Sequence, residues 1–531
     1  MRFSWWGHAA VWLLFGAIAL APLLQLGAAG LAPAGRFDAD GLAALLLTRG
    51  QWELLGTSLL LATGTMALAV AIGVPFALLC EKTDLFGRGS FALAALLPLL
   101  IPPAVHAIVW GRLLAQNGPV NTFLVGLLEL QSAPLDVHGL GGAIFVLAMA
   151  YFPFVTLLAA SGLKTLDRNC EAAALVQRGP LPTLWHITLP LLRPQIIAGA
   201  LFVFMFALID FGVPDILRLR VFPVEIFIQF SALYDERAAA LLSLPLLVLA
   251  MAVTALLVAA MRNRSYVSLG AGIAAPLRYR LGAWQPAALL FAITLIGLSV
   301  AVPLLALLVS AGHWTAYGKA LKAAGPSIGF SLLLATGAAA LMTLLALFAA
   351  VSIQQAREPW RTLLHYLSQV PFAVPAIVLG IGMIRLWNRP ATDWLYGTPL
   401  IIVLGYCAHY IPFAVRAVHA NLLQVQPHLL EAARLAGVTE LRLGLRILLP
   451  LLRNGLLTAF FITFVLSLGE LGVTLLVTPP GTTTIPITIY NYMHYGAEAT
   501  VSALCLILIA ITLLIGIAVR TALRRPIGDA R

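Results

Sequence analysis

The sequence predicts an all-α integral membrane protein with about twelve transmembrane helices, arranged as two parallel six-helix repeats. Three observations support this fold class: the composition, a series of long apolar runs, and a set of motifs that occurs twice in the same order. Of the 531 residues, 61% are hydrophobic and only 10% are charged, whereas a soluble domain has about 25% charged residues. So few polar residues cannot cover a water-soluble globule.

The apolar runs are long enough to cross a bilayer as helices, which takes about 20 residues. Inside the bilayer every backbone polar group needs an internal partner, and a helix supplies these partners within one segment. The twelve expected spans are 9–29, 54–80, 91–114, 140–162, 196–217, 238–261, 284–311, 327–352, 363–386, 399–420, 454–478 and 499–520.

The basic residues predict the orientation of these spans. With the N-terminus in the cytoplasm, 22 of the 32 Lys and Arg residues fall on the cytoplasmic side, as the positive-inside rule requires. This asymmetry accounts for the net charge of +11 without a nucleic-acid partner, since membrane lipid surrounds the chain. Both termini are then cytoplasmic. A signal peptide ending near Ala28 is the alternative for the first run, but the run is longer than a usual signal core.

An internal repeat divides the chain into two halves of six spans. An even number of spans inserts both halves in the same direction, so they form a parallel repeat about a pseudo-twofold axis along the membrane normal. The expected halves are residues 1–262 and 281–531, joined by a cytoplasmic linker at 263–280. The matching segments are Ser58–Gly64 with Ser331–Gly337, 101–111 with 370–380, Tyr151–Phe154 with Tyr410–Phe413, and Asp210–Val213 with Glu470–Val473.

A polar loop between the fourth and fifth spans is also repeated, at 163–195 and at 421–453. Residues 171–194 read EAAALVQRGPLPTLWHITLPLLRP, and residues 431–454 read EAARLAGVTELRLGLRILLPLLRN. Each loop predicts two short helices with a bend. Asn169 and Pro427 are suited to begin the first helix of each copy, and its dipole favours a carboxylate in the first turn. An amphipathic helix lying on the bilayer is the alternative.

The two copies differ at the expected bend. Gly437 permits a sharp turn in the second copy, whereas Gln177 occupies that place in the first, with Gly179 two residues later. The bend of the first loop is therefore expected to move by two residues. Pro190 and Pro450 are expected to end the second short helix before the next span begins.

The spacing of Glu-Ala-Ala, three residues, Gly, and about a dozen residues to Leu-Pro resembles the signature of permease subunits of type I binding-protein-dependent ABC importers. The resemblance covers both halves. It implies that each loop is a coupling helix docked on a cytoplasmic ATPase subunit. The residues that carry this role would be Glu171, Ala172, Ala173, Gln177, Gly179 and Pro190 in the first loop, and Glu431, Ala432, Ala433, Gly437 and Pro450 in the second.

The resemblance also implies the partners. The sequence lacks a GxxxxGK[ST] phosphate loop, so we expect a transport subunit that is not itself an enzyme and binds no cofactor. ATP and Mg would be bound by a separate ABC ATPase, expected as a homodimer. A periplasmic binding protein would deliver the substrate to this bacterial inner-membrane chain. Because only one loop keeps the Gly at its usual place, docking is expected to be asymmetric, with Gly437→Pro more harmful than the same change at Gln177.

Fusion of two halves in one chain resembles the ferric-iron and thiamine permeases, with the polyamine and organophosphonate systems related to them. Ferric iron is the favoured substrate, and thiamine, polyamines and organophosphonates are the alternatives within this class. An ion-gradient-driven secondary transporter is the alternative of another class, since parallel six-helix halves also occur there.

Four polar residues are candidates for the translocation pathway. Charges within a span are costly, about 2.5–3.5 kcal/mol at the centre, so Asp210 and Glu470 at equivalent places late in the fifth span of each half suggest a carboxylate pair that favours a cation. Each could instead lie at the outer interface or cap a broken helix. His106 and His409 are pore or packing residues. The scattered cysteines predict no metal site.

The external segments 215–236 and 475–496 follow these carboxylates and are long for hairpins. Each is expected to hold a short interfacial helix. The resemblance places the docking of the binding protein here, and a membrane-surface anchor is the alternative.

Overall fold

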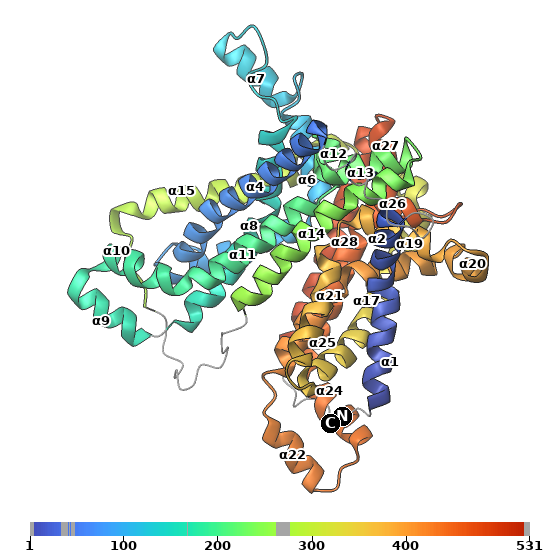
Figure 1. The fold of residues 1–531 in the computed structure, drawn as a ribbon. Coiled ribbons are helices and arrows are strands. Elements are labelled where there is room, and N and C mark those ends of the chain that lie inside the picture. Colours follow the sequence, from blue (N-terminus) through green and yellow to red (C-terminus); the bar gives the residue numbers. More distant parts are fainter. Residues whose placement is uncertain are drawn as a thin grey trace. The chain divides into compact units, whose positions relative to one another are not determined.

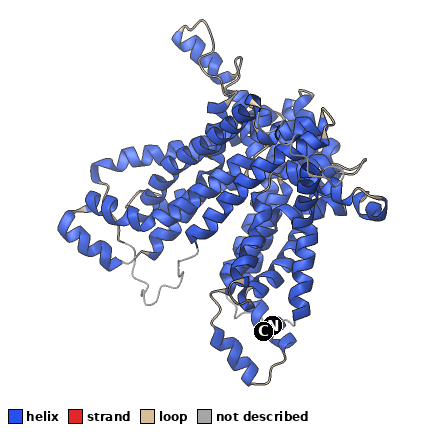
Figure 2. Cartoon of the chain, in the orientation of Figure 1, coloured by secondary structure: helices blue, strands red, loops and turns tan. Residues whose placement is uncertain are grey.

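The computed structural model describes residues 5–32, 41, 43, 48–166, 168–261 and 277–524. Within these ranges the regular structure is helical (Figure 2), apart from one isolated β-bridge between Thr83 and Tyr279. Nine helices in the described residues are long and apolar enough to span a membrane, and three bent helix pairs raise the number to as many as twelve. The all-α membrane fold is therefore confirmed, and the twelve expected spans equal the upper count, in which each bent pair is one span.

The helices of the first half include several long apolar helices, of which α4 is the longest, and a number of short elements (Figure 1). They are α1 (Trp5–Phe15), α2 (Ala21–Leu31), α4 (Arg49–Lys82), α5 (Arg88–Ala94), α6 (Pro103–Leu113), α7 (Pro119–Leu128), α8 (Leu140–Thr165), α9 (Arg168–Arg178), α10 (Pro180–Thr183), α11 (Leu189–Ile209), α12 (Gly212–Ile216), α13 (Phe222–Ser231) and α14 (Glu236–Met261).

The second half continues in the same order of long and short helices. They are α15 (Gln285–Ile296), α16 (Val302–Ala311), α17 (Trp314–Gln355), α18 (Trp360–Gln369), α19 (Ala376–Trp387), α20 (Asp393–Tyr396), α21 (Leu400–Leu422), α22 (Pro427–Leu435), α23 (Glu440–Leu443), α24 (Leu449–Leu451), α25 (Arg453–Leu468), α26 (Gly472–Val477), α27 (Ile485–His494) and α28 (Glu498–Arg524). The short helices expected in the two external segments are present as α13 and α27, and their interfacial location stays a prediction.

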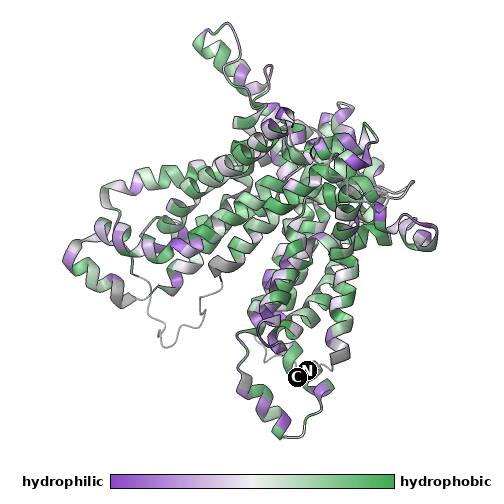
Figure 3. Cartoon of the chain, viewed as in Figure 1, coloured by the Kyte–Doolittle hydropathy of each residue, from purple (hydrophilic) through white to green (hydrophobic). Residues whose placement is uncertain are grey.

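Hydrophobic residues cover the bodies of the long helices, and hydrophilic residues gather on short helices and connections (Figure 3). This distribution is what a lipid-embedded helix needs, since its lipid-facing side has no water to solvate polar groups. The spans α4, α8, α17 and α28 all lie within segments that pass as membrane-crossing by length and composition.

Two expected spans are not straight. The third consists of Arg88–Leu100 and Pro103–Leu113 at 93°, and the ninth consists of Trp360–Ala373 and Ala376–Trp387 at 101°. A proline disfavours the helical region for the residue before it. Accordingly Ile101 and Val374, which precede Pro102 and Pro375, have extended backbones. The expected spans at 91–114 and 363–386 are therefore each divided into two helices.

Four π-helical turns each lie just before a proline in a span. They are η1 (Gly16–Leu20), η4 (Leu184–Thr188), η6 (Gly297–Ala301) and η9 (Gly444–Leu448). In every case the residue preceding the proline donates its N–H to the carbonyl five residues back. A proline ring clashes with the carbonyl four residues earlier and lacks the N–H that would bond it. One wider turn accommodates both problems without ending the helix.

This wider turn corrects the role expected for Pro190. The first loop's second helix, its π turn and α11 form one apolar segment, Pro180–Ile209, so Pro190 does not stop a helix there. In the second copy Glu440–Leu451 and Arg453–Leu468 bend by 69°, two residues after Pro450. The fifth and eleventh spans also end earlier than expected, at Ile209 and Leu468.

The described residues fall into two compact units that do not follow the sequence halves. One unit comprises Met1–Leu47, Glu225–Met251 and Ser310–Arg531, and the other comprises Thr48–Val224 and Ala252–Val309. In the first unit α1 and α2 pack against α17 and α19, and in the second α15 packs against α4 and α5. The first span of each half therefore packs with helices of the other half. Most of the expected linker 263–280 lies outside the described residues.

One hydrogen bond recurs at equivalent places in the two halves. The Ser58 hydroxyl of α4 accepts the backbone N–H of Phe222 at 3.0 Å, where α13 begins. The Ser331 hydroxyl of α17 accepts the N–H of Ile485 at 2.8 Å, where α27 begins. Ser58 and Ser331 open the identical seven-residue segments of the repeat, so the repeated sequence is used for the same contact twice.

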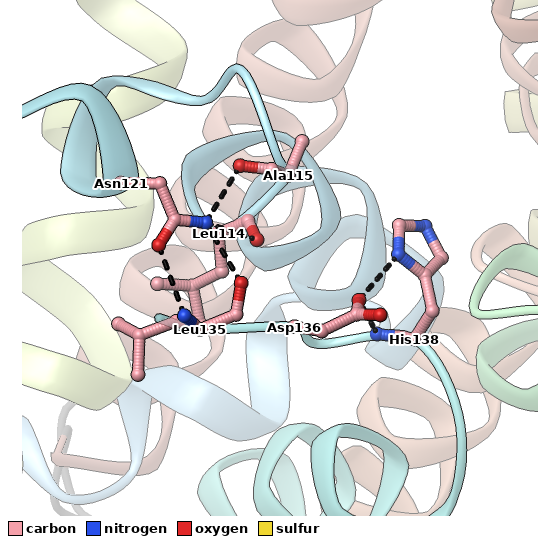
Figure 4. A network of polar contacts seen from close by, with 6 residues as sticks. All are labelled: Leu114, Ala115, Asn121, Leu135, Asp136 and His138. Carbon is pink, nitrogen blue, oxygen red and sulfur yellow. Dashed lines mark hydrogen bonds and ion pairs between the residues drawn. The ribbon is translucent and has the colours of Figure 1, made fainter. Parts of the chain in front are cut away.

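The connection between α6 and α8 is longer than its counterpart between α19 and α21, and it carries α7. Asn121, which is fully buried, holds this connection together (Figure 4): its Nδ2 donates to the carbonyls of Leu114, Ala115 and Leu135, and its Oδ1 accepts the Leu135 N–H. Nearby, backbone and side-chain hydrogen bonds from His138 lower the pKa of Asp136.

Candidate coupling loops and capped helix breaks

The first Glu-Ala-Ala loop bends at Gly179. Helix α9 ends at Arg178, Gly179 has φ +75°, and α10 begins at Pro180. Positive φ is open to Gly at no steric cost, because Gly has no Cβ. The bend thus lies two residues after Gln177, as the sequence predicts. Gln177 itself lies in the helix, and the Asn169 side chain lies outside the described residues.

The second loop uses the same device at Gly437, which also has φ +75°. Helix α22 begins at Pro427, as expected, and α23 follows the bend. The Arg434 Nε lies 2.9 Å from the Glu440 Oε1 and joins the two short helices across Gly437. Since both loops have a left-handed glycine, the expected asymmetry of docking cannot come from a missing glycine.

The repeat exposes apolar side chains at matching positions on the loops. Leu181 in α10 and Leu441 in α23 lie 260 residues apart, the same separation as Glu171 and Glu431, and each is 65% exposed. Val176 and Leu435, on the first helix of each loop, are 90% exposed. Contiguous exposed apolar patches mark sites that contact another protein or a membrane.

The glutamates of the two motifs have different environments. Glu171 is 1% exposed, and its Oε2 lies 2.5 Å from the Nζ of Lys82, a buried residue at the end of α4. Its other oxygen, Oε1, accepts a hydrogen bond from the Thr188 hydroxyl at 2.9 Å. A buried carboxylate is tolerated when it is paired and hydrogen-bonded, and both oxygens of Glu171 meet this condition.

Further contacts fix the end of α4 beside this ion pair. Glu81 pairs with Lys164 of α8 at 3.0 Å. The carbonyl of Lys82 accepts the N–H of Tyr279 at 2.7 Å, and the Tyr279 carbonyl accepts the Asp84 N–H at 3.2 Å. Burial, followed by the charge of Glu171, raises the pKa of Tyr279.

A small apolar cluster packs the helices of the same region together. It joins α4, α8 and α11 through Ala77, Ala159, Leu163 and Leu192. Gly162 allows α8 and α11 to approach closely, because a Cβ there would lie 2.6 Å from Leu192 Cδ1. The ion pair is therefore attached to three packed helices.

In the second copy Glu431 is turned to the surface. Its side chain is 65% exposed and lies 3.7 Å from the ring of His428. By the offsets of the repeat, Gln355 stands where the first half has Lys82, and Leu448 stands where it has Thr188. Without a cation and a hydroxyl, a buried carboxylate would be uncompensated, so the exposed position of Glu431 follows from these two replacements.

Asp210 and Glu470, the carboxylates proposed for the pathway, follow the ends of α11 and α25. Each accepts hydrogen bonds from the first N–H groups of the next short helix, α12 or α26. Asp210 Oδ1 accepts the Val213 N–H at 2.8 Å, and Tyr151 donates its hydroxyl to Oδ2 at 3.1 Å. In the second half Glu470 accepts the N–H groups of Val473 at 2.7 Å and Thr474 at 3.0 Å. An acceptor at this position satisfies helix N–H groups that have no partner within the helix.

The capped helices lie against the second arm of each broken span. Helix α12 packs on α6, and α26 packs on α19. Gly472 is needed for the second contact, since a Cβ there would lie 2.7 Å from the Ala376 Cβ. Asp210 and Glu470 therefore each link the end of a long span to a short helix, and that short helix packs on the second arm of a bent span. A role of Asp210 and Glu470 in the pathway stays a prediction.

The two histidines are buried in the spans. Both ring nitrogens of His106 are without a partner among the described residues, as is Nδ1 of His409. His106 lies in α6, in the second arm of the first broken span, and His409 lies in α21 with its ring 4.6 Å from that of Tyr410. Their assignment as pore or packing residues stays open.

Sequence reasoning missed Lys82, Thr188 and Tyr279. Lys82 counts toward the charge asymmetry, but its pairing depends on how α4 packs against the loop. The comparison of halves does contain a signal, since Lys82 at the end of one span has the uncharged Gln355 as its counterpart.

Comparison with known proteins places this arrangement in a family. Residues 342–527 match the family model described as binding-protein-dependent transport system inner membrane component. An Fe(3+)-transport system permease protein of Haemophilus influenzae is 27% identical over 470 residues, covering 86% of this chain and 87% of the relative. The chain is a permease of a binding-protein-dependent ABC transporter.

Two further relatives support this assignment of the permease. A ferric transport system permease protein of Actinobacillus pleuropneumoniae is 24% identical and covers 87% of the permease and 70% of its own length. A 2-aminoethylphosphonate transport system permease protein of Salmonella typhimurium is 29% identical over 211 residues, 39% of the permease. The matched family segment contains the second Glu-Ala-Ala loop and Glu470.

Proposed function

We propose that this permease imports a substrate delivered by a periplasmic binding protein, driven by a separate cytoplasmic ATPase that docks on both Glu-Ala-Ala loops. The observation that carries the proposal is that both loops have the same arrangement: a short helix, a glycine with positive φ, and a second short helix. Leu181 and Leu441 on the second helices are equally exposed. Two similar surfaces fit two copies of one partner, so the ATPase is a homodimer. ATP and Mg are bound by that partner, and the permease itself is not an enzyme.

The continuous helix of the first half supplies a route for the motion. Pro180–Ile209 runs from the bend of the loop to the cap at Asp210. A displacement of α10 therefore moves Asp210 and α12, which packs on the second arm of the broken span. Rigid elements with two arrangements are how coupling passes between distant sites.

The orientation proposed for the permease places both loops and both termini in the cytoplasm of a bacterial inner membrane. The excess of Lys and Arg on that side supports it. The contact of Lys82 with Glu171 agrees, because it brings the end of α4 to the same side as the first loop.

Ferric iron is the substrate we propose. Two relatives that match 86% and 87% of the permease are named as ferric-iron permeases, and Asp210 and Glu470 would favour a cation. Thiamine, a polyamine or an organophosphonate is the alternative, and a phosphonate permease matches part of the chain.

The test is uptake into proteoliposomes holding the permease with the ATPase and binding protein encoded beside it. We expect uptake that needs ATP and the loaded binding protein, and Glu431→Lys should abolish it. Competition among Fe³⁺, thiamine, polyamines and phosphonates for the binding protein identifies the substrate. Uptake driven by an ion gradient without the ATPase would instead establish a secondary transporter.

A further inference from the structure

The two Glu-Ala-Ala glutamates differ in what they are free to contact. Both oxygens of Glu171 are occupied inside the chain, by Lys82 at 2.5 Å and Thr188 at 2.9 Å. Glu431 is 65% exposed, and its carboxylate lies 3.7 Å from the ring of His428. A partner protein can therefore reach the carboxylate of the second loop and not that of the first.

The two halves of the sequence differ at three positions that bear on the environments of Glu171 and Glu431. Lys82, Thr188 and Lys164 of the first half correspond to Gln355, Leu448 and Leu423 of the second. Each replacement removes a charge or hydroxyl that holds the first loop or the α4 end beside it.

We propose that Lys82 is a positioning residue that locks the first loop to α4 through Glu171, whereas Glu431 is left to pair with a basic side chain of the ATPase. This inference rests on the proposed function. The two loops then have different roles. The first is a fixed extension of the membrane helices, and the second makes a salt-dependent ion pair with the ATPase through Glu431. The backbone hydrogen bonds of Tyr279 with Lys82 and Asp84 also hold the end of α4 in place.

The first test needs no partner. The whole permease in nanodiscs is treated with a water-soluble carbodiimide and an amine, and labelled carboxylates are found by mass spectrometry. We expect labelling of Glu431 and at least tenfold slower labelling of Glu171. Lys82→Met should expose Glu171 to the label, and Lys82→Arg should restore protection. Equal labelling of Glu171 and Glu431 in the unsubstituted protein would overturn the proposal.

The second test measures binding of the ATPase at 50 and 300 mM salt. Glu431→Gln should weaken binding by about two- to fivefold at low salt, the range of an exposed ion pair, and the loss should vanish at high salt. Glu171→Gln should bind normally at both salt concentrations but transport less substrate per ATP. The same salt-dependent loss in both variants would show that Glu171 contacts the partner and would refute the lock.

A double variant keeps the proposal testable if a single variant does not fold. Apolar replacement of a buried ion pair is often neutral, so Lys82→Met with Glu171→Met should fold, bind the ATPase normally and recover part of the transport lost in Lys82→Met. Loss of ATPase affinity in the folded double variant would contradict the proposal. If the unsubstituted permease binds no ATPase, the proposed function fails, while the labelling experiment still decides whether the lock exists.

Discussion

The Lys82 ammonium and the Glu171 carboxylate lie 2.5 Å apart, and both side chains are almost wholly buried. They are 89 residues apart in sequence and join the end of a long span to a loop that begins after a different span. The pair gives the first Glu-Ala-Ala loop an attachment that the second copy lacks. Its consequences for stability can be measured separately from transport.

Removing one partner of this pair should destabilise the protein strongly. Lys82→Ala leaves a buried carboxylate without its cation, which typically costs about 3–5 kcal/mol. Thermal unfolding in detergent should therefore show a clear drop in Tm. Gln355→Ala is the comparison at the equivalent end of α17, where no charge is removed, and its drop in Tm should be smaller. An equal drop in both variants would mean that the ion pair does not stabilise the fold.

The two bends should respond alike to substitution. Gly179 and Gly437 both have φ +75°, and a Cβ at either position would meet no atom within 4 Å. The cost of Gly→Ala is then backbone strain alone, about 1–2 kcal/mol. Coupling efficiency, measured as substrate moved per ATP, should fall similarly in both variants. Gly→Asn should be milder, because Asn tolerates the left-handed region.

This expectation replaces the comparison of Gly437→Pro with Gln177→Pro. Gln177 lies in α9, so a proline there would disturb the helix and would not report on the bend. Gly179 is the proper counterpart of Gly437. A much larger loss at Gly437 than at Gly179 would restore the idea that the second bend is functionally special.

Ser58 and Ser331 offer a test of the repeat. Each accepts the first N–H of an external helix, so Ser→Ala leaves a buried N–H without a partner, at about 1–3 kcal/mol. We expect similar losses of Tm in the two variants. Ser243→Ala is the control, since the buried Ser243 hydroxyl bonds a carbonyl of its own helix. Unequal effects of the two substitutions would show that the halves do not use this contact equivalently.

Much of this architecture could be predicted from the sequence, because it depends on local patterns. Apolar runs located the spans, and Gly179 located the shifted bend. The bends at Ile101 and Val374 were missed although Pro102 and Pro375 were visible, since a proline in a span can also be absorbed by a wider turn, as at Pro190. Choosing between these outcomes needs the packing of neighbouring helices.

The Lys82 pairing was missed for a related reason. Sequence alone gives a charge near the end of a span, and most such charges meet water. Only the approach of α9 to α4 shows that this one is buried. Similarly, Asp210 and Glu470 were recognised as equivalent carboxylates, but their capping contacts depend on the chain reversing direction after the span, which the apolar pattern does not reveal.

Capping and transport can be measured separately at Asp210. Asn caps a helix about as well as Asp, whereas Ala at a cap position typically costs about 1 kcal/mol. Asp210→Asn should therefore keep the Tm of the unsubstituted protein, and Asp210→Ala should lower it. If the carboxylate also attracts a cationic substrate, as we propose, both variants should lose ATP-driven uptake of Fe³⁺ in proteoliposomes. Normal uptake by a stable Asp210→Asn variant would restrict Asp210 to its structural role, and Glu470→Gln provides the parallel measurement in the second half.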